Sequence, residues 1–279
     1  MALEKSGDIL RDAFKKGYGI AAINVFNYET INLAIKNAEE IQKPLIVAFY
    51  PGWKEFIDIE MVAAIFKPLA SKVKIPVGLH LDHCTDFDEI RLAMDCGYSS
   101  VMYDGSLLPF DENVKNTAQV VKEAKARGID VEAELGQVGL ADNVDNFENS
   151  EMFTTPEDAK IFLERTDCSS LAVAVGNAHG NYARLPNLDI PRIQAIRDII
   201  NIPLVLHGGS GIPDKQVQAA VKAGIAKMNV ATEYHNAYYR AVLDYDKLKG
   251  KAKDMFFCSC DIRSNVLKFL DYKVKLLNP

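Results

Sequence analysis

The chain has 279 residues, enough for one large buried core, because α/β barrels routinely exceed about 200 residues without dividing into domains. Hydrophobic residues make up 48% of the chain and charged residues 25%, the usual mixture of a globular protein. The net charge of −6 argues against nucleic acid and anionic membrane surfaces as main partners. An anionic substrate must therefore be held by a local site.

The five cysteines are odd in number and form no C-x-x-C pair, which predicts reduced thiols. They are Cys84, Cys96, Cys168, Cys258 and Cys260. A redox or metal pair of Cys258 and Cys260 is the alternative. No apolar run approaches the length of a transmembrane helix, and the N-terminus lacks the apolar core of a signal peptide. We therefore expect a cytoplasmic protein.

Apolar runs alternate with predicted helices along the chain. Strands buried on both faces are predicted at Ala21–Phe26, Pro44–Tyr50, Pro76–His83, Ser100–Asp104, Val131–Leu135, Ser170–Val175, Pro203–His207 and Lys227–Ala231. Helices are predicted at Glu29–Gln42, Ile59–Ser71, Asp86–Cys96, Ile190–Ile200 and Asp214–Ala223, and after the last strand. A long helix after the fourth strand is predicted to end at about Arg127. Another is predicted to begin at Thr155 and Pro156, with Thr as the N-cap and Pro at the first helical position.

Eight strand–helix units in this length predict a TIM (β/α)8 barrel. Residues 1–279 are expected to form a single barrel domain, with about 233–279 as a C-terminal helical segment. An open, doubly wound sheet is the alternative. Polar residues at or near the carboxyl ends of the predicted strands favour the barrel, since that end is its catalytic face. These residues are Asn27, Asp82, His83, Asp104, Glu134, His179, His207 and Asn229.

Three of the five histidines, His83, His179 and His207, follow apolar runs in equivalent positions. A hydrogen-bonded strand-end histidine is the ordinary explanation for any one of them. Three imidazoles brought together at one end of a sheet are instead typical of a catalytic zinc site with an open position. His80 lies within the third strand and is expected to point into the barrel or to support the ligands. His235 is expected on the surface of the last helical segment.

Several carboxylates accompany these histidines. Asp82 adjoins His83 and is expected to transfer protons to a bound substrate rather than to orient the metal. Glu132 and Glu134 alternate with apolar residues, so both point to the interior side of the fifth strand. Buried charge there needs a partner or a metal. A second, transient metal position of Asp104 and Glu134 is one explanation, and a buried layer of ion pairs is the other.

Two segments have the properties of a phosphate site. Gly208-Gly209-Ser210-Gly211 follows the seventh strand, and Asn229-Val230-Ala231-Thr232 ends the eighth. Glycines allow close approach of the backbone, whose N–H groups can surround a phosphate. Barrels often place a phosphate after these two strands. The substrate is therefore expected to be phosphorylated.

With these motifs, the chain resembles the class II, zinc-dependent ketose-bisphosphate aldolases of the fructose- and tagatose-bisphosphate aldolase group. The likeness extends from about Ala21 to about Thr232. It is carried by Phe26-Asn27, His80-Leu81-Asp82-His83, Ser100-Val101-Met102-Tyr103-Asp104-Gly105-Ser106, Val131-Glu132-Ala133-Glu134-Leu135-Gly136, Ala172–Tyr182, the His207 loop and Asn229-Val230-Ala231-Thr232.

The resemblance implies a role for each matching residue. His83, His179 and His207 would hold the catalytic Zn²⁺, and Asp82 would move a proton at the bond that is made or broken. A monovalent cation, Na⁺ or K⁺, would support the phosphate of dihydroxyacetone phosphate, and the protein would be a homodimer or homotetramer. Substrate and phosphate would be bound by Asn27, Gly180, Gly208, Gly209, Ser210, Asn229, Ala231 and Thr232.

The flexible loop after the fifth strand departs from the family pattern. Asp142 stands where the family usually has the Glu that exchanges the enediolate proton, and Asn143 and Asp145 lie close to it. Asp142 is one methylene shorter than Glu. A displacement of about 1 Å can lower a rate by on the order of 10²-fold unless the loop compensates.

The aldehyde end departs as well. Tyr50 stands where the family usually has Ser or Thr, and Trp53 follows it. The tail from Asp244 onward contains one arginine, Arg263, which matches poorly the arginine that family members direct to the distal phosphate. Ala231 matches tagatose-type members rather than fructose-type members.

These residues predict a zinc-dependent aldolase that reversibly cleaves a ketose 1,6-bisphosphate of tagatose or fructose type, or a related ketose 1-phosphate. The products are dihydroxyacetone phosphate and an aldehyde. A class II aldolase for a non-phosphorylated or unusual aldehyde is the first alternative. A zinc hydrolase, or a non-catalytic barrel that binds zinc and phosphate, is the second.

Overall fold

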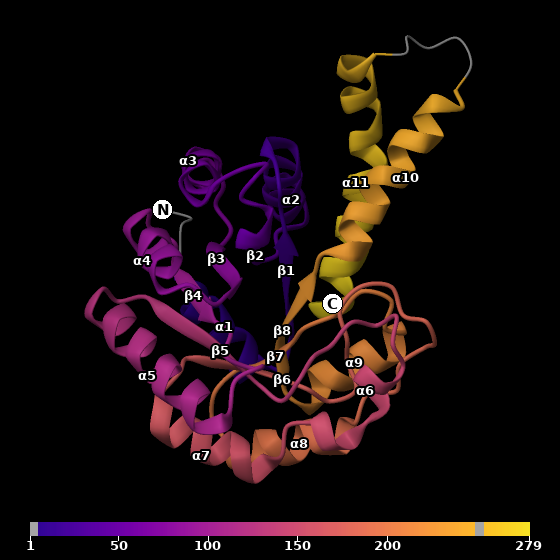
Figure 1. The fold of residues 1–279 in the computed structure, drawn as a ribbon. Helices are drawn as coiled ribbons and strands as arrows, with labels where there is room; N and C mark the ends of the chain where they lie inside the picture. The colour runs from indigo at the N-terminus through magenta and orange to yellow at the C-terminus, as the bar shows by residue number, and fades with distance from the viewer. Residues whose placement is uncertain (1–4, 249–253) are drawn as a thin grey trace.

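The barrel predicted from the sequence is present in the computed structural model, which describes residues 5–248 and 254–279. Within these ranges, parallel strands form one closed barrel in chain order, surrounded by helices (Figure 1). The open-sheet alternative is wrong, because β1 pairs with both β2 and β8. The strands are β1 (Ile20–Asn24), β2 (Leu45–Phe49), β3 (Val77–Cys84), β4 (Ser100–Tyr103), β5 (Asp130–Leu135), β6 (Ser170–Val173), β7 (Leu204–Leu206) and β8 (Ile225–Val230).

The helices largely follow the predicted pattern. They are α1 (Ser6–Lys16), α2 (Tyr28–Ile41), η1 (Pro51–Trp53), α3 (Ile59–Ala70), α4 (Phe87–Asp95), α5 (Phe110–Ala126), α6 (Asp145–Glu148), η2 (Ser150–Met152), α7 (Pro156–Thr166), α8 (Ile190–Ile199), α9 (Asp214–Ala223), α10 (Thr232–Asp246) and α11 (Met255–Leu277). The Thr155 hydroxyl accepts the N–H of Asp158 at 3.1 Å, which confirms the predicted cap of α7. Neither α1 nor the short α6 and η2 was expected. Across the described ranges, no helix has the length and apolarity needed to cross a bilayer.

Helix α1 closes the amino-terminal end of the barrel. Its apolar face packs against small inward-facing side chains of the strands, in a cluster of Ile9, Leu10, Ala13, Ile20, Ala22, Ile46, Ala48 and Ala226. The Ser6 and Ser99 hydroxyl oxygens lie 2.7 Å apart and join α1 to the residue before β4. The carboxyl-terminal end of the strands is therefore the end that a substrate can enter.

Strand β5 shows how the core and the interior are divided. Val131, Ala133 and Leu135 belong to the main hydrophobic core, while Glu132 and Glu134 are each only 1% exposed. This confirms the predicted period of two. Glu132 forms an ion pair with Lys227 at 2.8 Å inside the barrel, and Glu134 contacts His207 at the end of the sheet. The buried ion pair that was one of the two expected explanations is present at Glu132.

The described part of the predicted C-terminal segment consists of α10 and α11. The two helices lie side by side and project together from the barrel, and the end of α11 returns to the barrel wall (Figure 1). There α11 packs against α2, α9 and β1. Large apolar side chains at the start of α11, Met255 and Phe256, are 71% and 72% exposed.

Candidate active site

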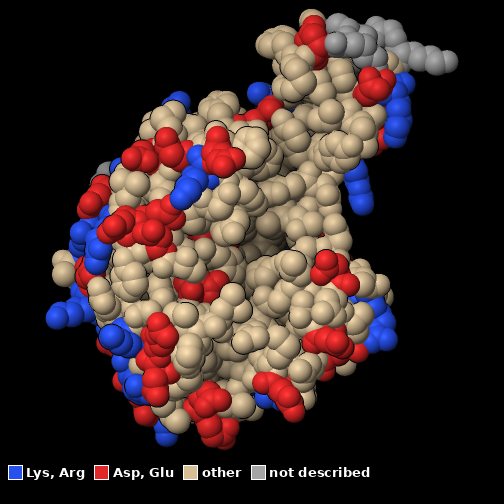
Figure 2. Space-filling view, in the orientation of Figure 1, with Lys and Arg blue, Asp and Glu red and all other residues tan. Residues whose placement is uncertain are grey.

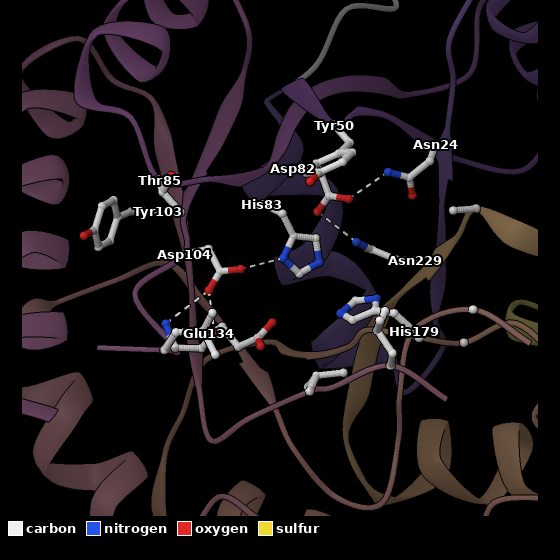
Figure 3. Close-up of a pocket in the computed structure, with 18 of the residues that line it drawn as sticks. Asn24, Tyr50, Asp82, His83, Thr85, Tyr103, Asp104, Glu134, His179 and Asn229 are labelled. Atoms are coloured by element: carbon white, nitrogen blue, oxygen red, sulfur yellow. Dashed lines mark hydrogen bonds and ion pairs between the residues drawn. The ribbon is translucent and has the colours of Figure 1, made fainter. Parts of the chain in front are cut away.

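A cavity of about 810 Å³ opens at the carboxyl ends of the strands. The face of the molecule seen in Figure 2 is hollowed at its centre, above the barrel. Figure 3 shows Asp82, His83, Asp104, Glu134 and His179 around one common space, although they come from different strands and loops. The cavity therefore lies where the polar strand-end residues of the sequence predict a catalytic face.

The three histidines predicted as metal ligands are brought together. His83 lies near the end of β3, His179 in the loop after β6 and His207 directly after β7. One ring nitrogen from each lies within 4.8 Å of those of the other two. The ring centre of His83 is 4.9 Å from that of His179 and 4.3 Å from that of His207.

His83 is turned toward the other two histidines by its backbone. Its φ of 48° lies in the left-handed region, which non-glycine residues rarely adopt, and the register between β3 and β4 shifts at this point. His83 Nδ1 donates to Asp104 Oδ2 at 2.7 Å. Asp104 Oδ1 in turn accepts the backbone N–H of Ser106 at 3.1 Å and its hydroxyl at 2.7 Å. The imidazole is thus fixed from one side, with its other nitrogen toward the cavity.

His207 has a carboxylate on each side of its ring. Nδ1 lies 2.6 Å from Glu134 Oε2, and Nε2 lies 3.0 Å from Glu132 Oε1. Burial lowers the pKa of His207, but these two hydrogen bonds outweigh burial and raise it to about 10. For His179, burial and the charges of the other two histidines lower the pKa to about 3.

The residues present fit a divalent metal. His83 Nε2 is buried and has no hydrogen-bond partner among the described residues, so its lone pair is available to a cation. Three imidazoles with adjacent carboxylates are a donor set that suits Zn²⁺. His83, Asp104 and Glu134 form a second group whose ligand atoms lie within 4.8 Å of one another, the pair of carboxylates predicted for the transient position.

Asp82 lies beside this group and is buried, with 2% of the residue exposed. Its two oxygens accept hydrogen bonds from Asn24 Nδ2 at 2.7 Å and Asn229 Nδ2 at 2.9 Å. Burial alone would raise the pKa of Asp82, but the charges of His83 and Lys227 outweigh it and hold that pKa well below its ordinary value. The carboxylate is therefore ionised and directed at the cavity, as a general base requires.

Asn24 is a residue that the sequence analysis missed. Asn27 was expected to bind substrate, but its side chain accepts the N–H of Thr30 at 2.8 Å and caps α2, and it is not among the residues that line the cavity. Asn24 lines the cavity instead. The sequence contains an indication of this position, because Asn24 is a polar residue inside an apolar run.

The predicted phosphate segments line one side of the cavity. The lining residues there are Gly180, Gly208, Gly209, Ser210, Asn229, Ala231 and Thr232. Gly208 has a φ of 61°, and a Cβ on it would lie 2.0 Å from the carbonyl oxygen of Ala178, so only glycine fits. Helix α10 begins at Thr232 and directs its amino terminus to this side, where backbone N–H groups and the helix dipole favour an anion.

The loop after β5 is joined to the His179 loop by backbone hydrogen bonds. Ala141 N donates to His179 O and His179 N donates to Gly139 O, both at 2.8 Å. Leu140 lines the cavity, whereas Asp142 is exposed and lies outside the lining. The structure therefore brings Asp142 near the rim of the cavity but not into it.

Another part of the cavity wall is aromatic and apolar, and it carries one carboxylate. It is formed by Tyr50, Trp53, Phe87, Tyr103, Leu107, Leu108, Glu112 and Asn116. Tyr50 lies 5.5 Å from Trp53 and 6.5 Å from His83, measured between ring centres. Among the described residues that line the cavity there is no lysine or arginine. Arg263 is not in the lining, and its Nε lies 3.8 Å from Glu29.

The two remaining histidines differ in outcome. His80 is 1% exposed and points into the barrel, as expected, with Nδ1 2.7 Å from the Ser100 hydroxyl. The expectation that His235 lies on the surface is wrong. His235 packs between Phe26 and Trp53, at 4.9 and 5.0 Å between ring centres, and its Nε2 bonds the backbone oxygen of Asn24. It is half-buried and supports the end of the first strand.

The thiols of Cys258 and Cys260 do not form a common site. Both residues belong to α11, where positions two residues apart point in different directions. Cys258 is buried and Cys260 is exposed. The alternative of a redox or metal pair at these positions is wrong.

Comparison with known proteins agrees with this geometry. The solved structure of the YdjI aldolase from Escherichia coli K12 is 34% identical with a TM-score of 0.88, and the match covers 99% of this chain and 97% of that one. A fructose-bisphosphate aldolase (Fba) from Campylobacter jejuni is 25% identical with a TM-score of 0.83, over 99% and 96%. The family described as fructose-bisphosphate aldolase class-II matches residues 4–278. The protein therefore belongs to the class-II fructose-bisphosphate aldolase family, which makes it a carbon–carbon lyase.

Proposed function

We propose that this protein is a zinc-dependent aldolase that reversibly cleaves a ketose 1-phosphate, or a ketose 1,6-bisphosphate, to dihydroxyacetone phosphate and an aldehyde. The observation that carries the proposal is that one cavity is lined by Asp82, by His83 and His179 of the three-histidine group, and by a glycine-rich anion site. Family membership supports an aldolase over the zinc hydrolase and the non-catalytic barrel.

His83, His179 and His207 would hold the metal, with Asp104 and Glu134 as the second or transient position. A bound Zn²⁺ supplies Lewis-acid polarisation of the ketose carbonyl. The residues around it fix the donors: Asp104 holds the ring of His83, and Glu134 contacts that of His207. Their carboxylates also provide the negative charge that a divalent cation requires in a buried site.

In the cleavage direction, Asp82 accepts the proton of the hydroxyl on C4. The electron pair left by the O–H bond forms the second bond of the aldehyde carbonyl as the C3–C4 bond breaks, and the C3–C4 pair passes into the enediolate of the phosphorylated fragment. Asn24 and Asn229 hold Asp82 in place by one hydrogen bond to each oxygen. A proton delivered to C3 completes the reaction, and we assign that step to Asp142, which the loop after β5 must bring inward from its exposed position.

The C1 phosphate is placed on the Gly180, Gly208, Gly209 and Ser210 side, in front of the amino terminus of α10. Since none of the described lining residues is a lysine or arginine, the phosphate depends on backbone N–H groups, on Ser210 and Thr232, and on the helix dipole. We infer that a monovalent cation, Na⁺ or K⁺, supports it, because the local charge is otherwise negative.

The aldehyde half of the substrate defines two candidates. Tagatose or fructose 1,6-bisphosphate is the class that Ala231 and the family suggest. A ketose 1-phosphate with a non-phosphorylated aldehyde is favoured by the apolar and acidic wall of Tyr50, Leu108 and Glu112, because a second phosphate would meet no cation of this chain among the described lining residues.

A cleavage assay on zinc-loaded protein tests the proposal. Tagatose and fructose 1,6-bisphosphates are compared with ketose 1-phosphates, each with and without a chelator, and release of dihydroxyacetone phosphate is measured. We expect chelator-sensitive release from at least one class. Release from the monophosphates alone would select the second candidate, and no release from either class would contradict the proposed function.

Further features of the protein remain proposals. We infer that residues 1–279 act as a single barrel domain, with about 233–279 as its helical extension, that the protein is a homodimer or homotetramer, and that it works in the cytoplasm on a small sugar phosphate, without nucleic-acid or membrane partners. Light scattering on the eluting protein tests the oligomeric state. A mass equal to one chain would contradict it.

A further inference from the structure

A buried ion pair lies directly beneath His207 in the barrel interior. Lys227 Nζ lies 2.8 and 2.9 Å from the two carboxylate oxygens of Glu132. Glu132 Oε1 also lies 3.0 Å from His207 Nε2. The three residues are 0–1% exposed. Burying two charges costs desolvation free energy, so we expect this ion pair to serve a function.

The two nitrogens of His207 face different compartments. Nδ1 lies on the side of the active-site cavity, because its neighbour Glu134 lines that cavity, although His207 itself is fully buried and is not a lining residue. Nε2 faces the barrel interior, because its neighbour Glu132 lies outside the cavity lining. Together with His80 and Lys227, Glu132 lines a void of about 10 Å³. Only Nδ1 is therefore on the side where His83 and His179 could share a metal with His207.

We propose that Lys227, acting through Glu132, is a positioning residue of the metal site. An ionised carboxylate only accepts hydrogen bonds, so Glu132 requires a proton on Nε2 of His207. In the neutral imidazole that a metal would bind, the lone pair is then on Nδ1, where a cation would replace the contact with Glu134 Oε2. Lys227 donates to both oxygens of Glu132, at 2.8 and 2.9 Å, and so holds this carboxylate in place beside Nε2. This inference rests on the metal site proposed above and adds to it the residues that set the tautomer of His207.

A purely structural role makes a different prediction. Replacing both members of a buried ion pair by apolar residues of similar size is often neutral for stability, whereas removing one member leaves an unpaired charge. If the pair only fills the barrel, the double replacement restores every property. If it orients His207, the double replacement restores stability but not metal affinity, because Nε2 has lost its acceptor.

The test compares Lys227→Met, Glu132→Leu and the double variant as full-length, metal-free protein. Zinc dissociation constants are measured by competition with a chromophoric chelator, and thermal unfolding gives stability. We expect the double variant to unfold near the wild-type temperature but to bind zinc about 10- to 100-fold more weakly, the usual effect of losing a residue that orients a ligand. Long-range ¹H–¹⁵N spectra of the zinc-loaded wild type should show the His207 proton on Nε2.

Lys273 offers a matched control. It is a second buried lysine, 1% exposed, whose Nζ lies 2.6 Å from Glu233 at the junction of α10 and α11. Lys273→Met should lower stability, as Lys227→Met does, and leave zinc affinity unchanged.

Wild-type zinc affinity in the double variant would overturn the inference, and so would an equal loss in Lys273→Met. A wild-type protein that binds no zinc would instead contradict the metal site on which the inference rests, so the two failures are distinguishable.

Discussion

Asp104 accepts the Nδ1–H of His83 at 2.7 Å, and the opposite nitrogen of the same ring, Nε2, is buried without a hydrogen-bond partner among the described residues. One carboxylate thus fixes both the orientation and the tautomer of the ring. Proteins orient metal-binding imidazoles in this way. Glu132 likewise contacts one ring nitrogen of His207, Nε2, but the other nitrogen of that ring contacts Glu134.

Removal of the Asp104 carboxylate should weaken the metal site without unfolding the protein. We expect Asp104→Ala to bind zinc about 10- to 100-fold more weakly, because His83 loses its acceptor. Chelator competition measures the constant. Asp111→Ala is the control, since Asp111 pairs with Arg165 on the surface, and its zinc affinity should match the wild type. An unchanged affinity in Asp104→Ala would contradict the assignment of His83.

Asp82→Asn should separate proton transfer from binding. The amide keeps the size of the side chain but cannot accept the hydroxyl proton, so kcat should fall by about 10²- to 10⁴-fold, the usual worth of a general base. Zinc stoichiometry should stay the same. Steady-state cleavage kinetics measure the change. Asp86→Asn is the control, because Asp86 caps α4 outside the cavity. A normal kcat in Asp82→Asn would remove Asp82 from the mechanism.

Gly208→Ala should damage the phosphate side. Its φ of 61° and the 2.0 Å approach of Ala178 O leave no room for a Cβ, so the loop must move and KM for the sugar phosphate should rise about tenfold or more, the effect of losing one hydrogen bond to a charged group. Gly17→Ala has a similar φ of 75° but open space around it. That control should lose about 1–2 kcal/mol of stability with KM unchanged. Equal KM values in both variants would place the phosphate elsewhere.

A cation placed on the cavity wall of Tyr50, Leu108 and Glu112, where we propose that the aldehyde half binds, should alter the preference between substrates. Glu112→Lys replaces the carboxylate of this wall by a positive charge. We expect the ratio of kcat/KM for a bisphosphate over a monophosphate to rise about 3- to 10-fold, as a partly exposed charge pair contributes about 1 kcal/mol. Glu157→Lys, on α7 outside the cavity, is the control. A constant ratio would show that the distal group does not approach Glu112.

The grouping of three histidines near Asp82 could be predicted because parallel strands bring their carboxyl ends together whatever their separation in the sequence. His83, His179 and His207 needed only the strand pattern. Asn27 was harder to judge. The first apolar run ends in structure at Asn24, and the side chain of Asn27 caps α2 through Thr30. An Asn three residues before a Thr is also a capping pattern, so local and catalytic explanations competed at one position.

Packing between distant elements was not predictable from any local pattern. His235 contacts Phe26 and Trp53, which lie about two hundred positions earlier, as the numbering itself shows. Lys227 illustrates the opposite case. A lysine inside an apolar strand run indicates a buried acidic partner. That this partner is Glu132 follows only from the closed barrel, which brings β8 and β5 together. The proposed role of Asp142 stays a prediction, because Asp142 is exposed and lies outside the cavity lining.

Closure of the barrel makes the beginning and the end of the chain depend on each other during folding. β1 pairs with β8 through Ala22 and Asn229, and Gly19 N donates to Leu277 O at 2.8 Å. A growing chain therefore carries two unpaired strand edges until β8 has been synthesised, and such edges promote aggregation. Contacts this far apart in sequence also slow folding. The cavity is lined by residues at the ends of both β1 and β8, Asn24 and Asn229 among them, so it is complete only after the last strand has paired with the first.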